Sequence, residues 1–156
     1  MEKEKFIQYY TDAFAIATKA HLSQKDIGGK PYILHPIEVA RHCISDKAKI
    51  VAILHDVIED SDIQIEDIRK IIPDEEILSA IVLLTKTVND RKGVGYVEYL
   101  KRIKANEIAC EVKIADLMHN MDLSRIPQLS DWDRRRQIKY RNSLDFLLGK
   151  TDEYKY

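Results

Sequence analysis

The residues best suited to chemistry lie in one stretch, Leu54–Asp60, which reads Leu-His-Asp-Val-Ile-Glu-Asp. An apolar run leads into it without Pro or Gly, so the pattern predicts a buried helix whose last turns are polar. Residues four apart on a helix share a face, which places His55 over Glu59 and Asp56 over Asp60. Such groups are costly to bury unless they are paired, hydrogen-bonded or bound to a cation. A bound divalent ion is the simplest way to compensate these buried groups. The alternative is an exposed helix end with acidic residues and an isolated histidine.

Two histidines and two aspartates from separate parts of the chain could bind one ion. They are His35, His55, Asp56 and Asp116. Imidazole nitrogens mixed with carboxylate oxygens suit Mn²⁺, Fe²⁺ or Zn²⁺ better than Ca²⁺, which prefers oxygen alone. No cysteine takes part, which argues against a structural zinc site. Four protein ligands leave positions on a six-coordinate ion for water and a phosphate oxygen, as a hydrolytic metal requires.

The elements that must position these side chains are all expected to be helical. Apolar residues recur at helical spacing, and no stretch keeps the alternation of a strand. The predicted helices cover about 6–22, 36–44, 46–60, 65–71, 75–85, 96–104, 107–121 and 132–148. We therefore expect an all-α fold, a single helical bundle over residues 1–156, with a core at about 6–149 and a polar C-terminal tail. On the last helix, Trp132 and Ile138 are expected to point inward.

Composition limits the possible partners. The 25 basic and 26 acidic residues give a formal net charge of −1, which argues against binding to nucleic acid or to an acidic membrane surface. A small anionic ligand needs only local positive charge and stays possible. The two cysteines lack a Cys-x-x-Cys spacing and are expected to be reduced core thiols. Without a signal peptide or a membrane span, we expect a cytoplasmic protein; nothing in the sequence indicates an oligomeric state.

Three segments carry a resemblance to a known family. The order of His35, the His55-Asp56 pair and Asp116 resembles the HD superfamily of metal-dependent phosphohydrolases. The segments that read GKPYILHP, LHDVIED and VKIADLMHNM resemble G-x-PYI-x-HP, LHDxxED and VKLADxxHNM of the RelA/SpoT-type alarmone hydrolase domain. The likeness runs in order from about Ala17 to Arg125. It implies a helical HD domain acting as a small stand-alone hydrolase, without the synthetase and regulatory domains of long members.

The resemblance also implies a reaction and roles for individual residues. The implied ligands of Mn²⁺, with Fe²⁺, Zn²⁺ and Mg²⁺ as alternatives, are His35, His55, Asp56 and Asp116. Glu59 and Asp60 are the implied acidic pair that activates or positions water, and Asn120 is the implied substrate-facing amide. The implied reaction removes pyrophosphate from the 3′ position of a guanosine tetra- or pentaphosphate, leaving GDP or GTP. Which acid is the base stays open.

Substrate contacts are expected from Lys25, Tyr96, Lys113 and Arg125, and for each a purely structural role is an alternative. Family members often carry an Arg-Lys pair before G-x-PYI, where this chain has Gln24-Lys25. Glutamine cannot stack or pair as a guanidinium does. The preferred base therefore stays open, and an adenine alarmone, NADPH or another nucleotide is an alternative substrate.

Two other functions remain as alternatives. A general HD nucleotidase that removes a 5′-phosphate would need the metal ligands but not the accompanying acidic pair. A catalytically weak nucleotide-binding sensor would fit the Gln24 departure. Among the remaining polar residues, His21 and His42 are expected on helix faces and Arg134–Arg136 on a solvated face. His119 could line the pocket or bond to a neighbouring helix.

Overall fold

The computed structural model describes residues 1–156, and its regular elements are helices, with one isolated bridge between Lys25 and Pro31. The α-helices are α1 (Lys3–Ala20), α2 (Leu34–His42), α3 (Asp46–Leu54), α4 (Val57–Asp60), α5 (Ile65–Ile71), α6 (Glu75–Leu84), α7 (Gly93–Lys104), α8 (Glu107–Asn120) and α9 (Asp131–Leu147). Two 3₁₀ turns are η1 (Val88–Asp90) and η2 (Leu123–Arg125). The all-α prediction is confirmed. None of the helices combines the length and the apolar composition needed to cross a bilayer.

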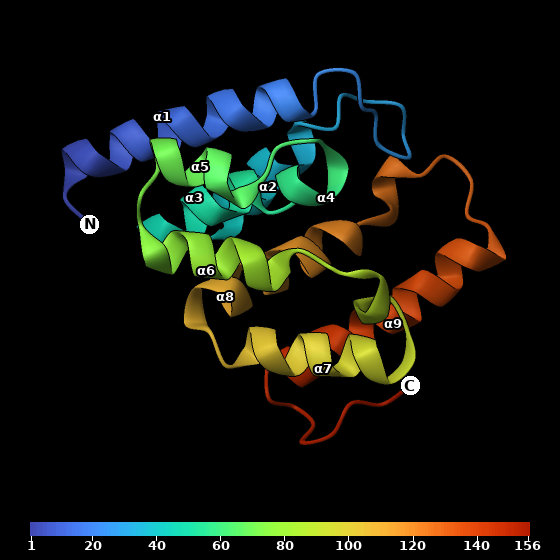
Figure 1. The fold of residues 1–156 in the computed structure, drawn as a ribbon. Helices are drawn as coiled ribbons and strands as arrows, with labels where there is room; N and C mark the ends of the chain where they lie inside the picture. The colour runs from blue at the N-terminus through green and yellow to red at the C-terminus, as the bar shows by residue number, and fades with distance from the viewer.

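Helix α3 lies at the centre of the bundle (Figure 1). It packs against α1 and α2 on one side and against α6 and α8 on the other. Helix α9 packs against α8 and α7, away from α1 (Figure 1). The elements that carry the candidate ligands therefore meet around one end of α3.

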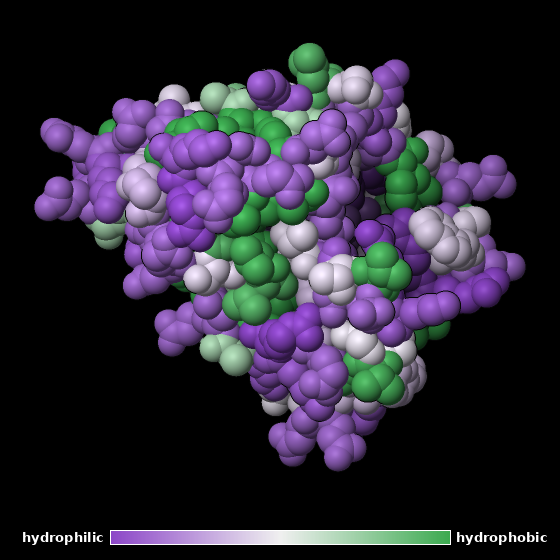
Figure 2. Space-filling view, in the orientation of Figure 1, coloured by the Kyte–Doolittle hydropathy of each residue, from purple (hydrophilic) through white to green (hydrophobic).

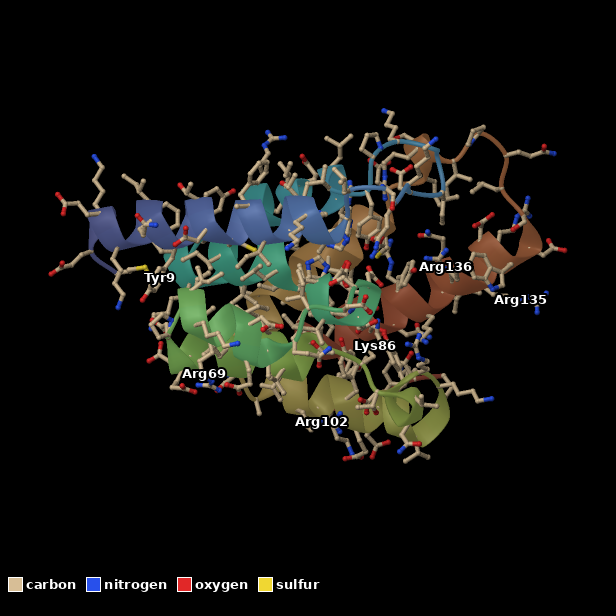
Figure 3. The ribbon with its side chains drawn as sticks, turned by 45° about the horizontal axis from the view of Figure 1, so that its top comes forward. Tyr9, Arg69, Lys86, Arg102, Arg135 and Arg136 are labelled. Carbon is tan, nitrogen blue, oxygen red and sulfur yellow. The ribbon has the colours of Figure 1, made fainter.

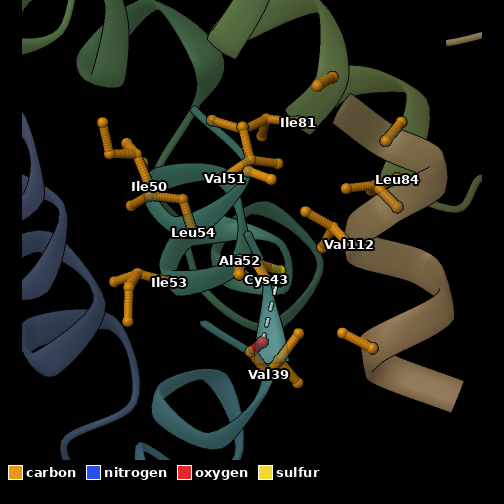
Figure 4. Packing of buried hydrophobic residues seen from close by; sticks show 14 of the residues in the cluster. Val39, Cys43, Ile50, Val51, Ala52, Ile53, Leu54, Ile81, Leu84 and Val112 are labelled. Atoms are coloured by element: carbon orange, nitrogen blue, oxygen red, sulfur yellow. Dashed lines mark hydrogen bonds between the residues drawn. The ribbon is translucent and has the colours of Figure 1, made fainter. Parts of the chain in front are cut away.

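The sequence of α3 explains its central position. Six of its residues are buried: Ala48, Ile50, Val51, Ala52, Ile53 and Leu54. A helix that is apolar on nearly all sides must be surrounded by other elements. Figure 4 shows side chains of α3 packed with Ile81 and Leu84 of α6 and Val112 of α8. Each fully buried side chain of this size contributes about 1.5–3 kcal/mol to stability, so the core fixes the end of α3 firmly.

The prediction of one helix running through Asp60 is wrong. Helix α3 ends at Leu54, His55 and Asp56 form a turn, and α4 is a separate helix of 4 residues. Adjacent residues on a helix point about 100° apart, so they cannot both face one ion. In the turn, His55 Nε2 and Asp56 Oδ2 lie 3.0 Å apart. The break brings the two functional groups to the same place.

Other boundaries follow local capping chemistry. The Asp74 and Asn106 side chains accept backbone N–H groups at the starts of α6 and α8, as the sequence predicts. Ser130 rather than Asp131 caps α9. The inward placement of Trp132 and Ile138 is wrong, because these side chains are 60% and 61% exposed. Most of α9 is polar, and only its side toward α7 and α8 is covered.

Glu111 of α8 holds the junction between α2 and α3. Its carboxylate accepts the backbone N–H groups of Ile44 and Ser45, the latter at 3.0 Å, and the Ser45 hydroxyl at 2.8 Å. These bonds tie the helix that carries Asp116 to the chain between the two histidine-bearing elements.

We expect Glu111→Ala to lower the free energy of unfolding by about 1–2 kcal/mol, because charge-assisted bonds are lost at a partly exposed site. Urea denaturation of this variant and of Glu4→Ala, an exposed position on α1, measures the effect. The control should change by no more than about 0.5 kcal/mol. Equal stability of the two variants would contradict this role of Glu111.

Candidate metal centre and substrate cavity

Four side chains from three parts of the chain meet at one point. His35 lies in the first turn of α2, His55 and Asp56 in the turn after α3, and Asp116 in α8. His35 Nε2 lies 3.0 Å from Asp116 Oδ1 and 3.8 Å from Asp56 Oδ2. His55 Nε2 lies 3.0 Å from Asp56 Oδ2 and 3.7 Å from Asp116 Oδ1. Nitrogen and oxygen atoms alternate around this quadrilateral.

The donor set fits a divalent cation. Two ligands at right angles with bonds of about 2.1 Å lie about 3.0 Å apart, close to the shorter sides here. His55 Nδ1 donates to the Ala52 carbonyl at 2.6 Å, which leaves the lone pair on Nε2. That Nε2 is buried and has no hydrogen-bond partner. His35, His55 and Asp116 also present ligand atoms within 4.8 Å of one another.

The charges at this point favour a cation. Burial alone would lower the pKa of His55, but the Asp56 and Asp116 carboxylates outweigh it and raise that pKa well above its ordinary value. Burial alone would raise the pKa of Asp116, but Lys113 and the two histidines hold it well below its ordinary value. Burial alone would likewise raise the pKa of Asp56, but His55 and His35 hold it below its ordinary value. Both carboxylates therefore stay ionised, and the space between the histidines attracts positive charge.

Polar neighbours fix the four side chains. Lys113 Nζ donates to Asp116 Oδ2 at 2.7 Å, and Asn120 Nδ2 donates to Asp116 Oδ1 at 2.8 Å. The Tyr32 hydroxyl donates to Asp56 Oδ2 at 2.5 Å. Tyr32 stands in the PYI part of the first motif, and this contact with Asp56 was not predicted from the sequence. The signal was its place two residues after a glycine-lysine turn and three before His35.

His119 supports His35 from α8. The two Nδ1 atoms lie 2.6 Å apart, and the rings stack with centroids 4.9 Å apart. Burial, then the neighbouring His35 and Arg125, lower the pKa of His119 to about 4. His119 is therefore a neutral partner of a histidine on a neighbouring helix, the second of its two expected roles.

A cavity of about 340 Å³ opens over this centre. On the surface it is the hollow between α4 and the segment that leads into α9 (Figure 2). Its basic lining residues are Lys25, Lys86, Lys113, Arg125 and Arg136. Asp56, Asp116, Glu59, Asp60 and Asn120 also line it. Three of the four candidate ligands, the implied acidic pair and most of the expected substrate residues thus share one cavity, and the buried His55 does not line it.

The acidic pair is held asymmetrically. Glu59 Oε1 accepts the backbone N–H of Lys86 at 2.5 Å, while Asp60 is exposed and no protein group donates a hydrogen bond to its carboxylate. Burial, then the Asp56 and Glu59 carboxylates, raise the pKa of Asp60 to about 6. The carboxylate of Glu59 is therefore held by a hydrogen bond, whereas that of Asp60 is not held and has a raised proton affinity.

Two basic residues of the cavity were missed in the sequence. Lys86 follows α6 outside any motif, and its pKa is lowered by Lys113 and by burial. Arg136 belongs to the run expected on a solvated face, but it turns toward the cavity while Arg135 points away (Figure 3). Its guanidinium lies 4.3 Å from the Trp132 ring centre and 5.3 Å from that of Tyr140. Only the final packing of α9 selects which arginine faces inward.

One expected contact, Tyr96, does not reach the cavity, and neither does Gln24, which stands where family members often carry an arginine. The Tyr96 ring is 4% exposed, and its hydroxyl pairs with Ser143 Oγ at 2.9 Å, so it is a packing residue between α7 and α9. Gln24 does not line the cavity either, because its side chain bonds to the Asp60 carbonyl and to His21. The structure removes Gln24 from the candidate base contacts.

Two loops form the outer wall of the cavity. Arg125 Nη1 lies 3.6 Å from Asp26 Oδ2, and its other terminal nitrogen donates to the His119 carbonyl at 3.1 Å. A Cβ added to Gly28 would lie 2.8 Å from the Arg125 carbonyl oxygen, so only glycine allows this approach. Lys25 lines the same wall.

Comparison with known proteins supports the relationship that the motifs predict. No protein-family model matches the chain. It is 36% identical over 128 residues to a guanosine-3′,5′-bis(diphosphate) 3′-pyrophosphohydrolase of Borreliella burgdorferi, covering 74% of this chain and 19% of the relative. It is 32% identical over 130 residues to the bifunctional (p)ppGpp synthase/hydrolase SpoT of Escherichia coli, covering 76% and 18%. The chain is a relative of the RelA/SpoT-type hydrolases. It spans less than a fifth of the length of these curated relatives.

A solved structure shares the fold. A metazoan ortholog of SpoT, described as hydrolysing ppGpp, superposes with a TM-score of 0.74 at 21% identity, covering 95% of this chain and 87% of that one. This similarity confirms the helical HD-type bundle.

We expect the chelator-treated protein to bind one Mn²⁺ per chain, and His55→Gln to weaken that binding by at least about 100-fold, because it removes the unpaired buried nitrogen. Isothermal titration calorimetry measures both. His42→Gln changes an exposed histidine of α2 and should bind like the unaltered protein. Undiminished Mn²⁺ affinity in His55→Gln would exclude His55 as a ligand.

Proposed function

We propose that this chain is a metal-dependent hydrolase that removes pyrophosphate from the 3′ position of guanosine 3′,5′-bis(diphosphate), leaving GDP. The observation that carries the proposal is the group of four ligand atoms at the floor of a cavity that also holds a free carboxylate and five basic side chains. Relatives in Borreliella burgdorferi and Synechocystis are named as a guanosine-3′,5′-bis(diphosphate) 3′-pyrophosphohydrolase and a probable one, which is the same reaction.

In this proposal the cation is held by His35, His55, Asp56 and Asp116. Mn²⁺ is the first choice, and Fe²⁺, Zn²⁺ and Mg²⁺ are alternatives for the same mixed nitrogen and oxygen donors. When bound, such an ion supplies Lewis-acid stabilisation of phosphate oxygens and lowers the pKa of water. Lys113 and Tyr32 keep the carboxylates oriented through hydrogen bonds.

Asp60 is the proposed proton acceptor. Its carboxylate lines the cavity without a hydrogen-bond partner, so it is free to take a proton from an attacking water. Glu59 is held by the Lys86 N–H and is assigned to positioning that water. Asn120 donates to Asp116 from one turn away and presents the rest of its amide to the cavity.

The basic side chains attract the phosphates of the substrate. Lys25, Lys86, Arg125 and Arg136 line the cavity from separate elements, so a ligand of several phosphates can meet positive charge from several directions. The cavity volume of about 340 Å³ lies in the range of about 300–1,000 Å³ common for small-molecule sites. The expected partner is a small nucleotide, and the balanced net charge of −1 speaks against nucleic acid.

A product assay tests the function. The protein is incubated separately with guanosine 3′,5′-bis(diphosphate), its adenosine counterpart, GMP and NADPH. Each reaction is run once with Mn²⁺ and once with excess chelator. We expect pyrophosphate release from guanosine 3′,5′-bis(diphosphate) in Mn²⁺, and none in chelator. Orthophosphate release from GMP would instead support a general nucleotidase. Absence of hydrolysis with every substrate would support a nucleotide-binding sensor.

Asp60→Asn should keep the affinity for Mn²⁺ and lower kcat by about 100-fold or more, because the amide cannot accept the proton. Steady-state hydrolysis and calorimetry on the same preparation measure the two quantities. Asp62→Asn, an exposed change two residues further on, should stay within about twofold of the unaltered rate. A fully active Asp60→Asn would remove Asp60 from proton transfer.

A further inference from the structure

The Gln24 side chain joins two parts of the chain that are far apart in sequence. Its Nε2 donates to the backbone carbonyl of Asp60 at 2.7 Å and to that of Ala20 at 3.3 Å. Its Oε1 lies 2.7 Å from His21 Nδ1. One amide thus connects the end of α1 to the last residue of α4.

The orientation of this amide is determined by its partners. Both backbone carbonyls only accept hydrogen bonds, so the NH₂ group of Gln24 faces them and Oε1 faces His21. His21 Nδ1 must then be the donor. The His21 ring is 2% exposed, and burial lowers its pKa, so it is a neutral donor held in the core. Gln24 is therefore fixed at both ends of its amide.

Helix α4 needs such external support. It has only 4 residues, and an isolated helix of one turn is not stable by itself. The Asp60 N–H donates to the Asp56 carbonyl at 3.0 Å, and the Asp60 carbonyl accepts Gln24. The Asp60 backbone is thus held at both its donor and its acceptor, and these two bonds fix the point from which its carboxylate reaches the cavity.

We propose that Gln24 is a positioning residue that, together with His21, fixes the Asp60 backbone so that the Asp60 carboxylate faces the metal centre. This rests on the proposed function for the role of Asp60. The four metal ligands have separate supports in Tyr32, His119, Lys113 and the Ala52 carbonyl. Loss of the Gln24 amide should therefore disturb the placement of the acid without removing the metal.

The expected kinetic signature is a fall in kcat with little change in KM. A misplacement of a catalytic group by about 1 Å can cost about 100-fold in rate, and partial fraying of α4 should cost about 10-fold. Gln24 does not line the cavity, so substrate binding should be unaffected.

The test compares Gln24→Met, which has similar length and no amide, with Gln24→Lys, which keeps a donor for the Asp60 carbonyl. Gln8→Met, at an exposed position on α1, is the control. Hydrogen exchange of the α4 amides and Mn²⁺-supported hydrolysis are measured on each. We expect Gln24→Met to exchange at least about 10-fold faster in α4 and to lose about 10-fold in kcat, with Mn²⁺ affinity, KM and global stability retained. Gln24→Lys should keep slow exchange.

Exchange in α4 that stays slow in Gln24→Met, or that rises equally in both Gln24 variants, overturns the positioning role. A kcat of Gln24→Met equal to that of the unaltered protein overturns it as well. If the unaltered protein shows no hydrolysis, the proposed function fails, and the exchange measurement still decides whether Gln24 holds α4.

Discussion

The buried carboxylate of Asp116 and the partly buried carboxylate of Asp56 face the same small space, and their combined negative charge must be compensated there. Two imidazoles alternate with them, and one of these, His55, has a buried nitrogen without a partner. Unpaired charge in a protein interior costs several kcal/mol, so the arrangement is stable only with a cation or protons between the ligands. The surrounding helices hold these side chains close together. The apolar helix α3 fixes the turn that carries two of the ligands, and α8 brings the second carboxylate to it.

Polar residues around the candidate ligands each hold one ligand side chain through a hydrogen bond. Lys113 and Tyr32 each bind one carboxylate, and His119 binds His35. These hydrogen bonds hold the candidate metal ligands in place in the protein. The acidic pair is built differently, because it sits on the single turn of α4 and depends on partners from other segments. A rigid centre for the cation and a separately held acid are consistent with hydrolysis of a phosphate ester at the cavity floor.

Sequence reasoning succeeded where the information is local. The apolar run of α3, the caps Asp74 and Asn106 and the three motifs each lie within a few residues, and together they predicted the fold and the residues that meet at the centre. It failed where long-range packing decides. The break at His55 arises because two adjacent side chains must face one point, which no propensity records. The direction of Gln24 depends on a carbonyl 36 residues away. The choice of Arg136 over its neighbours follows from how α9 rests on α8.

The most direct test is anomalous X-ray diffraction from crystals grown with Mn²⁺, with data collected at the manganese absorption edge. The account predicts one strong anomalous peak per chain, bonded at about 2.0–2.3 Å to His35 Nε2, His55 Nε2, Asp56 and Asp116, with at least one further position occupied by solvent. A peak bound elsewhere, or no peak while these four side chains keep their places, would contradict it.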